Sequence, residues 1–216
     1  MRNRFDEQLF ELNRMIIEMG AMCEEAIAAA AKALTDGDLA LAEKVKTNGS
    51  SIDRMERDIE GLCVKLLLHQ QPVARDLRLI SSALKIITDM ERIGDQAEDI
   101  AEIVTFLGGH TMENMYLIKE MARETIGMVT ASLDAFVKKD LTLAEDVIKH
   151  DDIVDDYFSR AKKDIISLIA KNPEDGEFAL DLLMISKYFE RIGDHATNIA
   201  EWVIYSVTGM HKEVET

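Results

Sequence analysis

The sequence predicts an all-α protein made of two tandem three-helix bundles, the second of which repeats the first. Apolar residues recur at spacings of three and four along nearly all of the 216 residues, and only two prolines and 11 glycines interrupt them. In addition, DMERIGDQAEDIAE at residues 89–102 returns ninety-nine residues later as YFERIGDHATNIAE. We therefore place the first bundle at residues 1–107 and the second at residues 108–216.

Three helices are expected in the first half. The first covers about residues 5–34, and the turn-forming TDGD at residues 35–38 ends it and caps the next helix. The second continues to about residue 69, where Pro72 follows. The third reaches about residue 107, because the glycine pair after it stops a helix.

The second half repeats this plan with helices at about residues 112–137, 141–170 and onward to 207. Its corner sequence DLTLAEDV, from Asp140, matches DLALAEKV, from Asp38, and Asn172-Pro173 breaks the chain where Gln71-Pro72 does so in the first half. Helices of about thirty residues are about 45 Å long, so each bundle should be an elongated rod.

Composition argues against several classes of partner. The formal net charge of −16 repels nucleic acid and anionic lipid, whereas it suits cations, basic protein surfaces or plain solubility. No run approaches the roughly 20 apolar residues of a membrane span, and the start of the chain lacks the apolar core of a signal peptide. Cys23 and Cys63 are isolated, so we expect reduced thiols in a soluble cytoplasmic protein without membrane insertion.

Pairs of like charges recur on the third and sixth predicted helices. Glu91 and Asp95 lie one helical turn apart, as do their repeats Glu190 and Asp194, and such pairs cost a few tenths of a kcal/mol in an exposed helix. Two interpretations remain open. In the first, arginines three residues before each aspartate (Arg92 and Arg191) form surface ion pairs on a solvated acidic face.

In the second interpretation the carboxylates bind metal ions, with help from the neighbouring helix of each half. The fifth helix offers Asp151 and Asp155, but the second offers only Asp53, because Gly49 stands where Asp151 would be. We therefore expect tighter binding in the second bundle, and predict these ligands: Asp53, Glu91, Asp95, Asp151, Asp155, Glu190 and Asp194. His150 and His195 adjoin the acidic motifs and are candidates for a nitrogen ligand, yet solvent exposure is expected for both.

The repeated ERIGD helices, the QPVARDLR segment at residues 71–78 and the paired DLxLAE corners together resemble the PhoU family over essentially the whole chain. The resemblance implies tandem three-helix bundles that are cytoplasmic, often homodimeric and without catalytic turnover. Members are taken to restrain phosphate uptake and to link a phosphate ABC transporter to a sensor histidine kinase. Some carry multinuclear clusters, iron or zinc among them, on Glu/Asp-x-x-x-Asp motifs.

We accordingly predict a metal-binding adaptor in phosphate signalling, with no catalytic residues. Arg75 and Arg78 are candidates for contact with an acidic partner surface, although they also suit an ordinary helix start after Pro72. An all-oxygen site does not choose among magnesium, manganese, iron and calcium, and the resemblance adds zinc. The alternatives are a metal-dependent hydrolase or metal-storage bundle, and a purely structural helical spacer.

Overall fold

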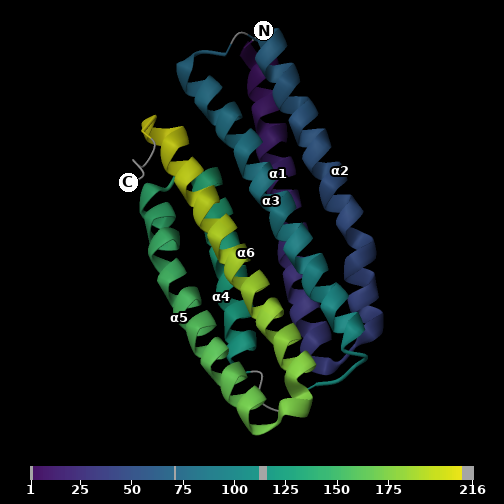
Figure 1. The fold of residues 1–216 in the computed structure, drawn as a ribbon. Helices are drawn as coiled ribbons and strands as arrows, with labels where there is room; N and C mark the ends of the chain where they lie inside the picture. The colour runs from purple at the N-terminus through teal and green to yellow at the C-terminus, as the bar shows by residue number, and fades with distance from the viewer. Residues whose placement is uncertain (1, 71, 112–115, 211–216) are drawn as a thin grey trace.

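The computed structural model describes residues 2–70, 72–111 and 116–210, over which the chain forms six α-helices, one short 3₁₀ helix and no strand (Figure 1). The predicted all-α class is confirmed. The elements are α1 (Arg2–Asp36), α2 (Leu39–Gln70), α3 (Ala74–Phe106), α4 (Tyr116–Lys138), α5 (Leu141–Lys171), the 3₁₀ helix η1 (Pro173–Asp175) and α6 (Gly176–Thr208).

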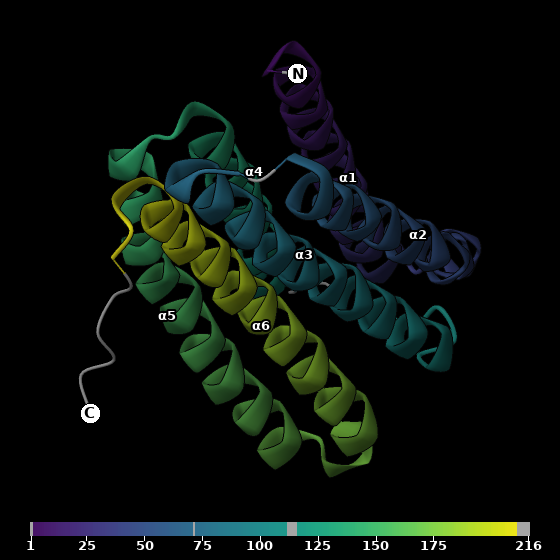
Figure 2. The ribbon, with the colours of Figure 1, turned by 90° about the horizontal axis from the view of Figure 1, so that it is seen from above.

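The two halves pack lengthwise against each other. Helices α1 to α3 form one three-helix bundle and α4 to α6 the other, and the most extensive helix–helix packing joins α3 to α6. Figure 2 shows these two helices side by side, with α2 and α5 on their outer sides. Helix α1 also packs against α4. One hydrophobic core therefore runs through both halves, and it contains residues as distant as Leu12 and Phe189.

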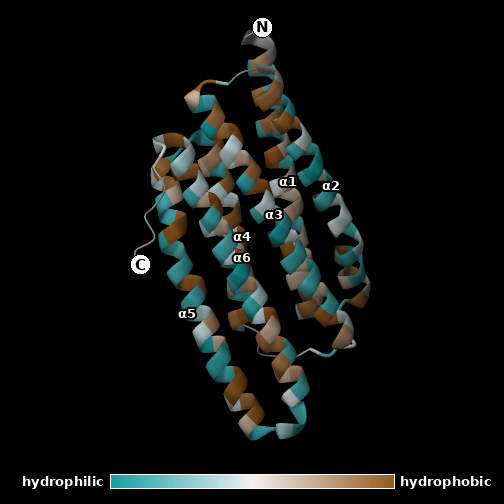
Figure 3. Cartoon of the chain, turned by 45° about the horizontal axis from the view of Figure 1, so that its top comes forward, coloured by the Kyte–Doolittle hydropathy of each residue, from teal (hydrophilic) through white to brown (hydrophobic). Residues whose placement is uncertain are grey.

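The core follows the apolar stripe expected on the third helix. Every member of that stripe is buried: Ile86, Met90, Ile93, Ala97, Ile100 and Val104. Figure 3 shows hydrophobic and hydrophilic colour alternating along the helices, as expected for amphipathic helices. Gly94 lets α2 come close to α3, because a Cβ there would lie 2.9 Å from Ile52 Cδ1. This close approach brings acidic residues of the two helices together.

The two bundle corners are built alike. Asp38 Oδ1 accepts a hydrogen bond from Leu41 N at 3.0 Å, and Asp140 Oδ1 accepts one from Leu143 N at 3.1 Å. Each aspartate thereby satisfies a free N–H of the helix that follows. The residue before each cap has a left-handed backbone, with φ of 66° at Gly37 and 56° at Lys139.

Helix boundaries agree with the predicted ones to within a few residues. The expected start of the fourth helix at Met112 lies outside the described residues, since 112–115 are not described. The expected division at 107/108 falls just after α3 ends. None of the described helices combines the length and the apolar character that a bilayer crossing requires.

Candidate metal centre

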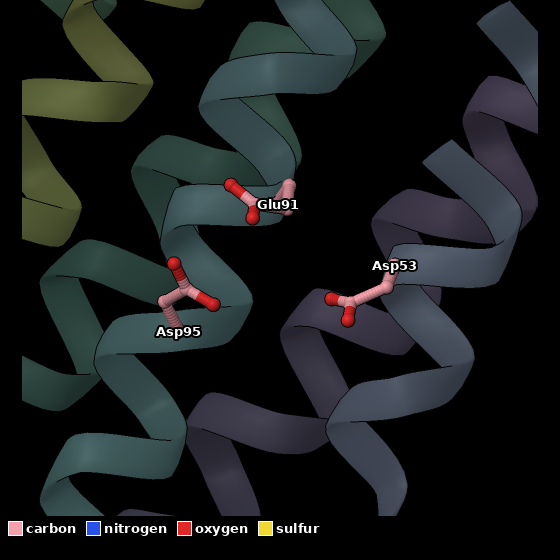
Figure 4. Close-up of side chains that lie close together, drawn as sticks. All are labelled: Asp53, Glu91 and Asp95. Carbon is pink, nitrogen blue, oxygen red and sulfur yellow. The ribbon is translucent and has the colours of Figure 1, made fainter. Parts of the chain in front are cut away.

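Three of the predicted ligands meet between α2 and α3. Asp53, Glu91 and Asp95 each place a carboxylate oxygen within 4.8 Å of the other two, and all three side chains are half-buried (Figure 4). Asp53 projects from α2 toward the pair on α3. The four-residue spacing of Glu91 and Asp95 puts both on one face of α3, so the second helix completes the cluster.

A fourth carboxylate, which is not among the predicted ligands, lies in the space beside Gly49. A Cβ at residue 49 would lie only 0.9 Å from Glu98 Oε1, so the Glu98 carboxylate occupies the space that a side chain there would take. In the second half the repeat places Asp151 at the position of Gly49 and Thr197 at that of Glu98. The carboxylate has thus changed helices between the two repeats. The paired exchange of Gly49/Glu98 for Asp151/Thr197 is the sequence signal that identifies it.

Burial and mutual repulsion raise the pKa values in this cluster. Burial, followed by the charges of Asp53 and Asp95, raises the pKa of Glu98 to about 7. Burial and then the Asp95 charge also raise the pKa of Glu91. The negative charges of these four half-buried carboxylates therefore repel one another at neutral pH, and a bound cation would reduce that repulsion.

Arg92 of α3 also forms the surface ion pairs expected under the first interpretation. Arg92 Nη1 lies 3.1 Å from Asp95 Oδ2, and Arg92 Nε lies 3.5 Å from Glu91 Oε2. The Arg92 side chain is 56% exposed, and exposed pairs contribute only about 0.2–1 kcal/mol. Among the residues the structure describes, no basic nitrogen lies within 4 Å of the carboxylates of Asp53 or Glu98. Arg92 therefore neutralises one edge of the cluster only.

The second bundle is arranged differently. Its predicted ligands, Asp151, Asp155, Glu190 and Asp194, influence one another, since burial and then the charges of the other three raise the pKa of Asp151 to about 6. However, Lys187 holds Glu190 in an ion pair, and no three of the four carboxylates share the 4.8 Å spacing found in the first bundle. The first repeat has Thr88 where Lys187 stands.

Two expectations for the second bundle concern the partner of Asp194 and the strength of metal binding. The predicted pair of Arg191 with Asp194 is not formed, because Asp194 has no basic nitrogen within 4 Å in the described structure; the lysine one turn earlier takes the counter-ion role with Glu190. Tighter metal binding by the second bundle stays a prediction. The arrangement of side chains favours the first, where the carboxylates already converge.

The histidines beside the acidic motifs have carboxylate partners on other helices. His150 Nε2 lies 2.6 Å from Glu124 Oε2, and His195 Nδ1 lies 2.9 Å from Asp89 Oδ1. The expected exposure of His195 was wrong, because its side chain is only 17% exposed in the contact between α6 and α3. The two cysteines are free and buried.

Arg75 and Arg78 lie in the first two turns of α3, more than two helical turns before Glu91. They are therefore separate from the carboxylate cluster and line a cavity of their own. Their contact with an acidic partner surface stays a prediction.

Fold and cluster together define a duplicated helical bundle with clustered carboxylates between neighbouring helices. A family model described as "PhoU domain" matches residues 16–104 and again residues 118–203. The chain therefore belongs to the PhoU family, and the matched segments fall one in each half.

Curated relatives match over nearly the full length. A "Phosphate-specific transport system accessory protein PhoU homolog" of Clostridium acetobutylicum is 36% identical over 212 residues, covering 96% of both chains. The homolog of the same description from Pseudomonas aeruginosa is 35% identical over 208 residues, covering 95% of this chain and 86% of the relative.

Two solved structures share the fold. The crystal structure of PhoU from Pseudomonas aeruginosa has a TM-score of 0.91 at 35% identity, covering 95% of this chain and 100% of that one. The phosphate transport system regulatory protein PhoU from Streptococcus pneumoniae has a TM-score of 0.87 at 28% identity, covering 97% and 100%.

Proposed function

We propose that this protein regulates phosphate transport and phosphate-starvation signalling as a cation-binding adaptor. The observation that carries the proposal is the convergence of Asp53, Glu91 and Asp95 between two helices of a PhoU-family bundle. The full-length relatives are named as accessory or regulatory proteins of phosphate transport, which supports the transport side of the role. The protein acts by binding rather than by catalysis.

The donor set fits a hard metal ion. Every group in the first cluster is a carboxylate oxygen, which is the ligand type that magnesium, manganese and iron accept. Asp53, Glu91 and Asp95 would hold the ion, and Glu98, lying over Gly49, is close enough to the others for its charge to interact with theirs. The ion would supply positive charge that neutralises the cluster.

The protein's own residues give this charge neutralisation a structural consequence. Asp53 belongs to α2, whereas the other carboxylates belong to α3, so neutralisation of the cluster favours close contact of these two helices. Helix α3 in turn packs along α6 of the other half. The state of the cluster is therefore linked to the relative arrangement of both bundles, and hence to the outer surfaces that would meet partners.

The partners proposed are a phosphate ABC transporter component and a sensor histidine kinase in the cytoplasm, with the protein as a homodimer. A net charge of −16 favours basic partner surfaces, while Arg75 and Arg78 provide a local basic contact. The adaptor role needs several contacts at once, and the long outer faces of six helices supply the area.

Two measurements test the proposal together. Elemental analysis of protein purified without chelator should find metal, and deletion of the gene should leave phosphate-starvation genes active in phosphate-rich medium. Normal repression in the deletion strain would refute the regulatory role. Phosphate-ester turnover by the metal-loaded protein would instead favour the hydrolase alternative, and metal at background level would favour a solvated acidic face.

A further inference from the structure

A cavity of about 220 Å³ lies at the end of the molecule where α3 begins and α6 ends, the upper end in Figure 1. Three basic side chains line it, namely Arg75 and Arg78 of α3 and Lys139 of the corner between α4 and α5. A single carboxylate, Asp76, lines it too, and Ser206 of α6 adds a polar wall. The cavity therefore joins residues of both halves.

Among the described residues, no carboxylate serves as a counter-ion to the basic groups in this cavity. Although the chain carries a net charge of −16, no carboxylate of the described residues lies within 4 Å of the charged nitrogens of Arg75, Arg78 or Lys139. The Nε atom of Arg78 is buried and has no hydrogen-bond partner. A buried guanidinium N–H without an acceptor among the described residues is open to an acceptor from a bound anion.

Packing holds Arg78 where it is. A Cβ at Gly209, the residue that ends α6, would lie 3.5 Å from the Cδ, Nε and Cζ atoms of Arg78, so the side chain lies against the end of that helix. A guanidinium that is already held in one position loses little conformational freedom when it binds an oxyanion, which favours bidentate binding.

Lys139 is placed by a backbone conformation that glycine normally adopts. Its φ is 56°, and the matching corner of the first repeat has Gly37 with φ of 66°. A side chain at such a position is strained relative to glycine. The second repeat nevertheless carries a lysine there, and that lysine lines the cavity.

We propose that this cavity is a binding site for a small tetrahedral oxyanion that carries a proton, with hydrogen phosphate as the fitting case. Arg75, Arg78 and Lys139 would donate to its oxygens, and the first N–H groups of α3, whose N-cap Val73 provides no side-chain cap, point to the same end. Asp76 would accept the hydrogen bond of the protonated oxygen. Sulfate has no such proton at neutral pH, so Asp76 would repel it.

Calorimetric titration of the full-length protein in chelator-containing buffer tests the proposal, because no metal-bound phosphate can then contribute. Inorganic phosphate should bind with one-to-one stoichiometry, and sulfate should bind about tenfold more weakly or not at all. Arg78→Gln should weaken phosphate binding by about tenfold or more, the size expected for a lost charge-assisted hydrogen bond. Asp76→Asn should reduce the preference for phosphate over sulfate.

Two further variants separate binding from folding. Lys139→Gly restores the residue that the first repeat uses, so it should raise the melting temperature while weakening phosphate binding. Arg160→Gln, at an exposed arginine of α5 that contacts Asp156 and the Tyr157 ring, should leave binding unchanged. Equal affinity for the two anions, no heat of binding at millimolar phosphate, or unchanged affinity in Lys139→Gly and Arg78→Gln would overturn the proposal. The proposed metal-binding role is tested separately, by measuring the metal content of the protein.

Discussion

Asp89 of α3 and His195 of α6 are joined across the two repeats, with 2.9 Å between Oδ1 and Nδ1. Asn198 of α6 donates to the same oxygen at 3.2 Å. The repeat matches Asp89 with Tyr188 and Asn198 with Asp99, and these counterparts also meet: burial and then the Asp99 charge raise the pKa of Tyr188. The contact between α3 and α6 thus has approximate twofold symmetry, and its polar pairs fix how the two helices align.

Asp89→Ala should destabilise the protein by about 1–3 kcal/mol, because it leaves the largely buried His195 without its acceptor. Urea unfolding followed by circular dichroism measures the change. Asp58→Ala, at an exposed aspartate of α2, is the matched control and should stay close to the parent. Equal stability of the two variants would show that this contact does not hold the halves together.

Asp95→Asn should remove more bound metal than Asp194→Asn, because the first cluster has converging carboxylates and the second has Lys187 paired with Glu190. Elemental analysis of both variants after identical purification gives the comparison. Lys187→Thr, which copies Thr88 of the first repeat, should raise metal binding by the second bundle. Greater loss in Asp194→Asn would restore the ranking expected from the sequence.

Gly49→Ala should displace the Glu98 carboxylate, since a Cβ there would overlap its Oε1. The end of a flexible side chain can move away, and alanine favours a helix over glycine by about 1 kcal/mol, so the metal-free protein should melt at the same or a higher temperature. Metal affinity should fall. Gly61→Ala, on the same helix with open space around it, is the control and should stabilise without changing affinity. Unchanged affinity in Gly49→Ala would exclude Glu98 from the site.

The metal-free protein should be more stable near pH 5.5 than near pH 7.5. The pKa of Glu98 rises from 4.5 to about 7 on folding, so the folded state binds more protons than the unfolded state between these values. Stability therefore falls as pH rises through this window. Thermal melting with chelator across the window measures it, and Glu98→Gln should make the profile shallower, while Asp151, whose pKa burial raises to about 6, keeps part of the slope. A parent profile as flat as that of the variant would contradict the assigned cause.

The helices and corners could be predicted because their determinants are local. Asp38 and Asp140 cap the helices that the sequence assigned to them, and the four-residue spacing correctly put Glu91 and Asp95 on one face. The position of the Glu98 carboxylate beside Gly49 could not be predicted in the same way, since it depends on how closely α2 approaches α3.

The contacts between the two halves could not be predicted from the sequence either. The repeat shows that two similar bundles exist, but it carries no information on which faces they turn to each other. The single core and the pairing of His195 with Asp89 follow from the packing of α3 on α6, which no periodicity within one helix specifies. The ion pair of Lys187 with Glu190 could not be predicted, because it depends on side-chain positions along α6, and the sequence pointed instead to a pair of Arg191 with Asp194.

The packing of α3 against α6 has a consequence for the order in which the chain is synthesised. Helix α6 is the last of the described helices, so the face of α3 that it covers stays open to water until α6 itself has been synthesised. A chain that stops after α5 would therefore present apolar surface along α3, α4 and α5 at once. During that interval these uncovered apolar faces are open to association with other chains.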